Sequence, residues 1–212
     1  MTMKLYYAHT MNPRKTCAVA KYLGSPVDYI RVDLAQGEQR TPEFLALNPN
    51  GKVPLLVDGD LHLWESTAIM AHLAVKAGSE LWPAEAVRQV EVLRWLSWDL
   101  SHFARHGGTL YFEHHIKPLI FGRDEPTQAA VEEANGFYKR FATVLDNHLA
   151  QHTYLAGEKL SIADFGVGGL LPWANEARLP IEGFANIARW HERLMALPAW
   201  RDPFPEPLPA AA

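Results

Sequence analysis

The stretch Asn48–Leu56 constrains the fold more than any other part of this chain. A Val53-Pro54 step precedes a short apolar run, then come Asp58-Gly59 and a second apolar run. Asp-Gly between two apolar runs is a strong hairpin signal. A proline cannot donate to a strand ladder, so it belongs at the first residue of a strand or at an edge. The pattern therefore predicts strands over Leu55–Val57 and Leu61–Leu63, joined by a tight turn.

Two polar residues follow the hairpin where a helix is expected to begin. Glu65 and Ser66 stand at the start of a predicted helix over Ser66–Lys76. The first turn of a helix has free N–H groups and the positive end of the helix dipole, and both favour an anion. With the Val-Pro strand edge, this arrangement indicates a receptor for an extended peptide that carries a carboxylate at one end.

The two parts of the chain differ in periodicity. Up to about Lys76, strand and helix patterns alternate, which indicates an α/β unit with a mixed sheet. The elements expected ahead of the hairpin are strand Leu5–Tyr7, helix Pro13–Leu23, strand Asp28–Val32 and helix Pro42–Leu47. From Ala84 onward, apolar residues recur at helical spacing, as at Val87, Val90 and Leu93, so we expect only helices there. Gly107-Gly108 is expected to bend or break the first long helix.

Size and composition exclude several classes of protein. The 212 residues suffice for two modest domains, and a net charge of −4 without a Lys/Arg run argues against nucleic-acid binding. The single cysteine excludes an internal disulfide and a thiolate zinc cluster. No apolar run reaches membrane-spanning length, and no signal-peptide pattern precedes Lys4. We therefore expect a cytoplasmic, reducing compartment and no membrane partner.

These motifs, in this order and spacing, resemble those of the cytosolic glutathione transferase family. The resemblance covers nearly the whole chain, and it is carried by the Val-Pro and Glu-Ser motifs together with Lys4-Leu5-Tyr6-Tyr7, Pro13–Leu23, Pro42-Glu43-Phe44 and Ser161–Phe165. It implies a thioredoxin-like glutathione-binding domain over 1–77, a linker over 78–86 and an all-helical domain over 87–212. It also implies a homodimer that uses glutathione as co-substrate, with no other cofactor.

The resemblance assigns a role to each end of glutathione. Val53 and Pro54 would pair through the backbone with the cysteinyl part, while Glu65 and Ser66 would hold the γ-glutamyl end. Gln39 and Lys52 would meet the glycine carboxylate, and Lys52 suits this role as a point charge. Asp99 lies in a region from which family members reach across the dimer to the glutathione amino group.

The family's chemistry needs the glutathione sulfur as a thiolate, whereas a thiol of pKa about 8.5 is only about 3% ionised at pH 7. Pro13 suits the first turn of a helix, so Asn12 is a natural N-cap. Thr10 and Asn12 resemble the Thr-x-Asn of the bacterial Nu-like and related fungal branches, so they are our candidates for stabilising the thiolate. Tyr6 or Tyr7, as in mammalian-type members, is the alternative. Cys17 is expected to be a buried apolar residue rather than a nucleophile.

The second domain is expected to contact the electrophile. His102, His106, Tyr111 and Phe112 lie on or just after its first long helix and could form an aromatic, imidazole-lined wall. His102 and His106 are spaced i, i+4, which is the spacing of a two-His metal corner. A third ligand and the supporting acid motif are missing, so we expect no metal.

Ser161 and Asp164 have the spacing of a capping box, with Asp in place of the usual Glu. We expect Ser161 to cap a helix that begins near Ile162 and Asp164 to be buried, which would make this motif structural.

These features together predict a glutathione transferase that promotes attack of the glutathione thiolate on a hydrophobic electrophile. A glutathione-dependent disulfide-bond reductase or peroxidase is the first alternative. A non-catalytic glutathione-binding or interaction protein of the same fold is the second.

Overall fold

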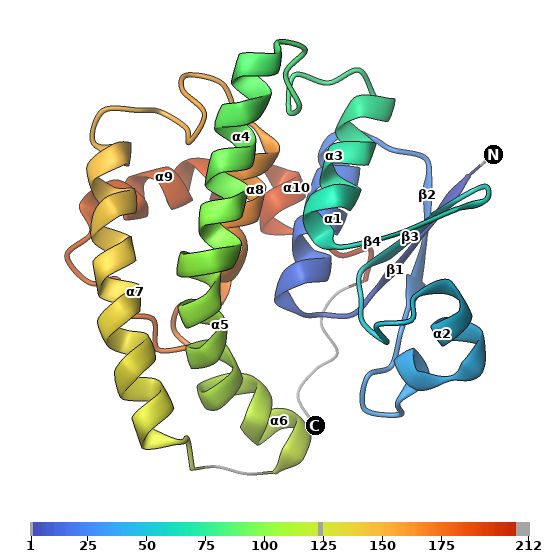
Figure 1. Cartoon of the computed structure of the whole chain (residues 1–212), viewed down its shortest axis with the longest axis horizontal. Helices are drawn as coiled ribbons and strands as arrows, with labels where there is room; N and C mark the ends of the chain where they lie inside the picture. The colour runs from blue at the N-terminus through green and yellow to red at the C-terminus, as the bar shows by residue number, and fades with distance from the viewer. Residues whose placement is uncertain (1, 123–124, 207–212) are drawn as a thin grey trace. The chain divides into compact units, whose positions relative to one another are not determined.

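The structure is a computed structural model that describes residues 2–122 and 125–206, and these residues form two compact units (Figure 1). Residues 2–82 and 195–206 make up the first unit, and residues 83–194 make up the second. The resemblance implied an all-helical domain over residues 87–212. Residues 195–206 group with the first unit instead, because α10 (Pro198–Arg201) packs on α1 (Met11–Tyr22).

The first unit holds a four-stranded mixed sheet in the order β2-β1-β3-β4. Strand β1 is parallel to β2, with Leu5 opposite Tyr29, and antiparallel to β3, with Leu5 opposite Leu56. The bounds of its elements are β1 Met3–Tyr7, α1 Met11–Tyr22, β2 Val27–Arg31, α2 Pro42–Leu47, β3 Leu55–Asp58, β4 Leu61–Trp64 and α3 Ser66–Lys76. The predicted α/β unit with a mixed sheet is confirmed.

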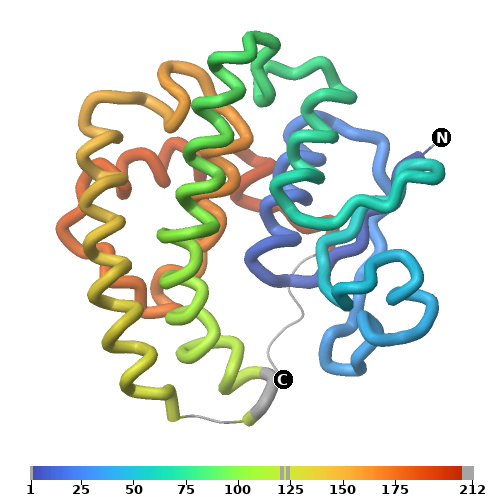
Figure 2. Tube along the Cα trace, viewed as in Figure 1, coloured from blue at the N-terminus to red at the C-terminus, as the bar shows by residue number. Residues whose placement is uncertain are grey.

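Strand alternation gives this sheet two apolar faces. Leu5 of β1 is fully buried, and α1 and α3, which run side by side in Figure 2, belong to the layer that packs on its face of the sheet. On the opposite face, Phe44 of α2 packs with Val32 and Leu55 in a separate cluster. Burying both faces explains why the sheet needs helices on each side.

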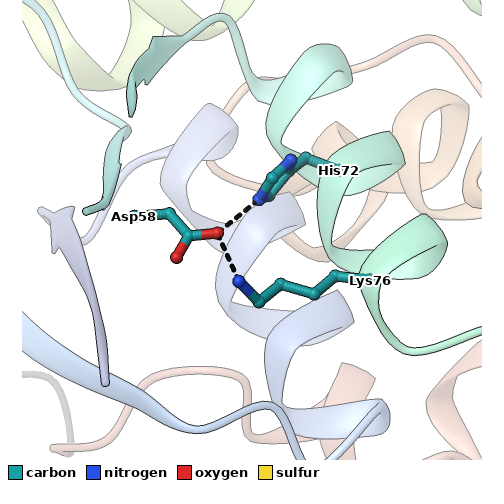
Figure 3. A network of polar contacts seen from close by, with 3 residues as sticks. All are labelled: Asp58, His72 and Lys76. Carbon is teal, nitrogen blue, oxygen red and sulfur yellow. Dashed lines mark hydrogen bonds and ion pairs between the residues drawn. The ribbon is translucent and has the colours of Figure 1, made fainter. Parts of the chain in front are cut away.

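The β3–β4 hairpin has the predicted Asp-Gly turn, in which Gly59 has a φ of +61°. The Val53–Pro54 peptide bond before β3 is cis. At the far end of β3, the carboxylate of Asp58 accepts hydrogen bonds from Lys76 Nζ at 2.6 Å and His72 Nε2 at 2.8 Å (Figure 3). Both partners lie on α3, so this network fastens that helix to the hairpin.

The second unit is helical, as predicted. Its helices are α4 Ala86–Trp98, α5 Ala104–Tyr111, α6 Lys117–Phe121, α7 Gln128–Leu149, α8 Ile162–Val167 and α9 Ala185–Met195, the last of which ends at the border with the first unit. Single π-helical turns over Asp99–Phe103 and Phe112–Ile116 join α4 to α5 and α5 to α6. No helix in the described ranges is both long and apolar enough to cross a membrane.

The expectation that Gly107-Gly108 would break the helix is wrong, because α5 runs through both residues. Gly107 is buried where α5 meets α7, and a Cβ atom there would lie 2.8 Å from Tyr138 Cε2 and 2.7 Å from Leu170 Cδ2. Gly108 faces open space. The first glycine therefore permits close helix packing.

The capping box is confirmed. Ser161 is the N-cap of α8, and its Oγ accepts a hydrogen bond from the Ala163 amide. Asp164 is fully buried, and its Oδ2 accepts a hydrogen bond from the Ser161 amide at 2.9 Å. These contacts satisfy donors of the first helical turn that would otherwise lack a partner.

Candidate functional site

A polar hollow of about 140 Å³ opens in the first unit beside the hairpin. It brings together six of the predicted residues, which are Asn12, Lys52, Val53, Pro54, Glu65 and Ser66. Asn48, Asn50 and Trp64 complete the lining. Lys52 and Glu65 are both exposed, so the rim of this hollow has one positive and one negative charge. That pairing suits a zwitterionic ligand.

Two helices begin at this hollow. Asn12 lies in the first turn of α1, and Ser66 is the first residue of α3. The first N–H groups of a helix have no partner within it, and they add to the positive end of the dipole. The hollow therefore offers two separate places that favour negative charge.

The prediction that Asn12 caps the helix is wrong by two residues. Helix α1 begins at Met11, and Thr10 is its N-cap, with extended backbone and no side-chain capping hydrogen bond. The pattern placed Pro13 at the very start of the helix, but proline is also tolerated one or two positions further into the first turn. Asn12 is exposed, and its side chain is therefore free of the capping role.

Glu65 has an unusual backbone conformation at the entrance to α3. Its φ of 71° and ψ of 118° make it one of two non-glycine residues with positive φ among those described. Non-glycine residues rarely adopt positive φ, and such strain concentrates at functional sites. Glu65 and the following Ser66 both line the hollow, so this unusual conformation occurs at the candidate site.

Asn48 shapes the loop that leads to the Val-Pro step. It is 1% exposed, its Nδ2 donates a hydrogen bond to the Lys52 carbonyl at 2.7 Å, and its Oδ1 accepts one from the Asn50 amide at 3.1 Å. These bonds close the loop across Asn48–Lys52 and thereby position Val53. The sequence interpretation missed Asn48, Asn50 and Trp64, although an Asn-Pro-Asn-Gly run is a clear turn signal.

The competing thiolate donors lie away from the lining of the hollow. Tyr7 is 1% exposed, its ring packs against Phe204, His9 and Tyr29, and burial, together with Glu206 and Cys17, raises its pKa. Tyr6 is half-buried with its ring edge against Phe44. Neither tyrosine lines the hollow.

Cys17 is fully buried in α1, and burial raises its thiol pKa to about 12. A thiol in that environment is not a reactive nucleophile. This agrees with the prediction that Cys17 is a packing residue.

Three predicted glutathione contacts or donors do not line the hollow. Thr10 precedes α1 and is half-buried. Gln39 lies in a 3₁₀ turn over Glu38–Arg40, and its carbonyl approaches Gly51 of the neighbouring loop. Asp99 is 2% exposed within the second unit, on the π-helical turn after α4. Their roles stay predictions.

The predicted electrophile contacts divide into separate groups in the second unit. His102 stacks on Phe141 with ring centroids 4.7 Å apart, and His106 stacks on Phe137 at the same distance. Tyr111 is buried against Trp173 and His115, whereas Phe112 is 42% exposed. In the described ranges, no three His, Cys, Asp or Glu side chains gather to hold a metal ion.

Comparisons with known proteins agree with this architecture. The family model for the glutathione S-transferase N-terminal domain matches residues 1–75, and the one for the C-terminal domain matches residues 110–198. The chain is 34% identical to glutathione S-transferase 3 of Zea mays, with 97% of each chain covered. It is 31% identical to the disulfide-bond oxidoreductase YfcG of Escherichia coli, over 92% of this chain and 91% of that protein.

A solved structure gives the same result in three dimensions. The theta class glutathione S-transferase of the citrus canker pathogen Xanthomonas axonopodis pv. citri, with glutathione bound, matches at a TM-score of 0.86 and 29% identity, over 98% of this chain and 99% of that one. A thioredoxin-like unit followed by a helical unit is the architecture of the glutathione transferase class, as the resemblance implied. The chain belongs to the glutathione S-transferase family.

Proposed function

We propose that the hollow of the first unit binds glutathione and stabilises its thiolate for attack on a hydrophobic electrophile. The observation that carries this proposal is that the N-termini of α1 and α3 both open on one hollow. Two of the three anionic groups of glutathione, its thiolate and its γ-glutamyl carboxylate, could meet these two positive ends. The similar Xanthomonas enzyme, solved with glutathione bound, supports the same ligand.

Five of the lining residues then have a role in holding glutathione. Glu65 and Ser66 hold the γ-glutamyl amine and carboxylate, the Val53 backbone pairs with the cysteinyl part, and Lys52 attracts the glycine carboxylate. Asn12 donates to the sulfur from the first turn of α1. Thr10 and Gln39, which lie outside this lining, remain candidates for glutathione contacts. Asp99 remains a candidate for the amino group, and His102, His106, Tyr111 and Phe112 remain candidates for the electrophile.

The proposed reaction is a nucleophilic substitution in which the glutathione sulfur loses its proton and attacks a carbon atom of the electrophile. The thiol proton leaves to solvent, the thiolate forms a carbon–sulfur bond, and the leaving group departs with its bonding electron pair. Lowering the thiol pKa by about two units would raise the thiolate population at pH 7 roughly 25-fold. A positioned donor and a helix N-terminus act in this direction.

Calorimetric titration with glutathione tests the site. Removing a partner from a charged hydrogen bond costs about 1.5–3 kcal/mol, so Glu65→Ala and Ser66→Ala should each weaken binding roughly 10- to 150-fold. Glu43→Ala removes an exposed carboxylate from the first turn of α2 and should leave affinity unchanged. Unchanged affinity in both hollow variants would exclude this site.

A glutathione-dependent disulfide-bond reductase or peroxidase is the second candidate. The 31% identity to a disulfide-bond oxidoreductase is the observation that favours it. Here the thiolate would attack a disulfide sulfur, and a second glutathione would release the reduced product as oxidised glutathione forms. Comparing turnover of a glutathionyl mixed disulfide with that of a chloronitrobenzene acceptor separates the two reactions. A non-catalytic glutathione-binding role would show binding without turnover of either.

We further propose a homodimer in the cytoplasm, where glutathione is held as a thiol. Support comes from α4, which exposes 77% of Val87, 61% of Val90 and 46% of Leu93. Such an apolar face is unfavourable in water and suits a second copy of the chain. Light scattering should report a dimer, and Val90→Glu should shift it toward the monomer, whereas a monomeric wild-type protein would contradict this proposal.

A further inference from the structure

A shallow hollow of about 260 Å³ lies in the second unit, where the end of α7 meets α9. Its polar lining comprises Arg189, Arg193, His152, Gln151 and Thr153. Among the described residues, no carboxylate lines it. Two guanidinium groups therefore line this hollow without a carboxylate in the lining.

The first arginine is oriented by a network that joins the two helices. Asp146, near the end of α7, accepts hydrogen bonds from the Asn186 amide at 2.9 Å and the Ile187 amide at 3.0 Å in the first turn of α9. The Asn186 side chain donates to the same carboxylate and accepts a hydrogen bond from Arg189 Nη2. Arg189 is exposed, and its hydrogen bond to Asn186 orients the guanidinium.

The second arginine has an unused donor. Nη2 of Arg193 donates to the Thr153 carbonyl at 3.1 Å, while its Nε is shielded from solvent and has no hydrogen-bond partner among the described residues. A shielded donor without an acceptor is unfavourable, so protein groups satisfy the guanidinium of Arg193 only in part. Arg189 and Arg193 are four residues apart on α9, so both project from one face of that helix.

The carboxylates nearby, Asp146 among them, do not line the hollow. Glu158 accepts a hydrogen bond from Thr153 Oγ1, and Glu192 is exposed on α9, but neither lines the hollow. His152 is half-buried, and its Nδ1 donates to the His148 carbonyl at 3.0 Å, which fixes the orientation of its ring. The wall is thus set before any ligand arrives.

We propose that this hollow binds the phosphate group of a small solute. Arginine forks match phosphate oxygens geometrically, and a phosphate group presents three acceptor oxygens to two such forks. A single carboxylate has only two oxygens and is satisfied by one fork. The hollow is far larger than one water requires and is open to solvent, so a phosphomonoester could place its phosphate here with its remainder outside.

Calorimetry at low ionic strength tests the proposal, with inorganic phosphate and glycerol 3-phosphate as probes and a buffer free of other oxyanions. We expect saturable binding at one site per chain that weakens at least tenfold in Arg189→Gln and in Arg193→Gln. Arg105→Gln removes the same charge from an exposed position on α5 and should bind like the wild type. Glutathione affinity should be unchanged in all three variants.

Arg193 is half-buried and its replacement could disturb packing, but Arg189 is exposed, so the Arg189→Gln result decides the matter if the other variant fails to fold. Absence of saturable phosphate binding would overturn the proposal. So would binding that survives Arg189→Gln, or a dicarboxylate such as succinate that binds more tightly than phosphate.

Discussion

Trp190 Nε1 donates a hydrogen bond to Asp164 Oδ1 at 3.0 Å, so the carboxylate that caps α8 also ties α9 to it. The same oxygen accepts a hydrogen bond from the Leu155 amide at 3.0 Å. Both Asp164 and Trp190 are fully buried. One side chain thereby satisfies donors from a helix start, a loop and a second helix, which makes it a structural centre of the second unit.

Replacing Asp164 with alanine should destabilise the protein strongly. It leaves the Leu155 and Ser161 amides and Trp190 Nε1 without acceptors, and each buried unsatisfied group costs about 1–3 kcal/mol. We expect a loss above about 3 kcal/mol in the free energy of urea unfolding. Ser161→Ala removes the cap and one hydroxyl hydrogen bond to Asp164 Oδ2, but it leaves the carboxylate in place, so it should cost less, about 0.5–2 kcal/mol. Equal stability of Asp164→Ala and the wild type, with activity abolished, would point to a catalytic role instead.

The two adjacent glycines of α5 should respond in opposite ways to alanine. Gly107→Ala forces a methyl group to within 2.8 Å of Tyr138 Cε2, so overpacking should cost about 1–3 kcal/mol. Gly108→Ala meets open space and should be neutral or stabilise the helix by up to about 1 kcal/mol. Thermal unfolding of the two variants measures the difference. Similar effects at both positions would contradict the close packing at Gly107.

Local sequence patterns predicted parts of the fold because the interactions that form them are between residues close in sequence. The Asp-Gly turn, the Val-Pro strand entry and the Ser161–Asp164 cap each depend on a few neighbouring residues, and the structure contains all three. The prediction at Gly107 was wrong because the contact that requires a glycine there is made by Tyr138, which lies on another helix. No pattern within α5 reports that contact.

The candidate site was predictable only where a motif spans it. The motif residues from Lys52 to Pro54 and at Glu65-Ser66 line the hollow, but Asn48 contributes through hydrogen bonds within its loop. His102 and His106, four residues apart, share one side of the helical run, whereas Tyr111, five residues after His106, does not. The rings that each of them meets, on α7 or at Trp173, come from other parts of the chain, and helical spacing does not report those contacts.

The Asp58 network predicts a pH dependence of stability. Hydrogen bonds from Lys76 and then His72 lower the pKa of the Asp58 carboxyl. A carboxyl with a lower pKa in the folded state binds fewer protons there than in the unfolded chain. Its contribution to stability is therefore complete above the unfolded pKa of about 3.9 and is lost as pH falls through the folded value.

Asp58→Asn should accordingly lower stability near pH 7 and make the acid loss below about pH 4 less steep. Urea midpoints measured across this pH range give both quantities. Asp60→Asn changes an exposed carboxylate in the same hairpin and should retain the wild-type slope. Identical slopes in the wild type and Asp58→Asn would show that the network does not stabilise the folded state.

Cys17 should resist thiol reagents in the native protein. With a pKa of about 12 and a fully buried side chain, its thiolate fraction at pH 8 is about one part in ten thousand. An aromatic disulfide reagent should react with no thiol in buffer and with one thiol in urea. Cys17→Ala should keep glutathione-dependent turnover, whereas rapid native labelling or loss of turnover would reopen a cysteine mechanism.

The sharpest prediction concerns the group that stabilises the glutathione thiolate. Asn12 lines the hollow in the first turn of α1, next to amides that have no partner within the helix. Asn12→Ala should raise the pKa of bound glutathione by about one unit, or about 1.4 kcal/mol. Thr10→Ala should raise it less, because Thr10 lies outside the lining. Ultraviolet titration of the thiolate in the bound complex measures both shifts.

Tyr7→Phe provides the matched control, because it removes only the hydroxyl that competes for this role. The Tyr7 ring is buried among His9, Tyr29 and Phe204, and it does not line the hollow. The titration of bound glutathione should therefore be the same in Tyr7→Phe and in the wild type, and Cys17→Ala should behave likewise. A shift in Tyr7→Phe with none in Asn12→Ala would move the donor to the end of β1, while the glutathione site itself would still stand on the Glu65 and Ser66 variants.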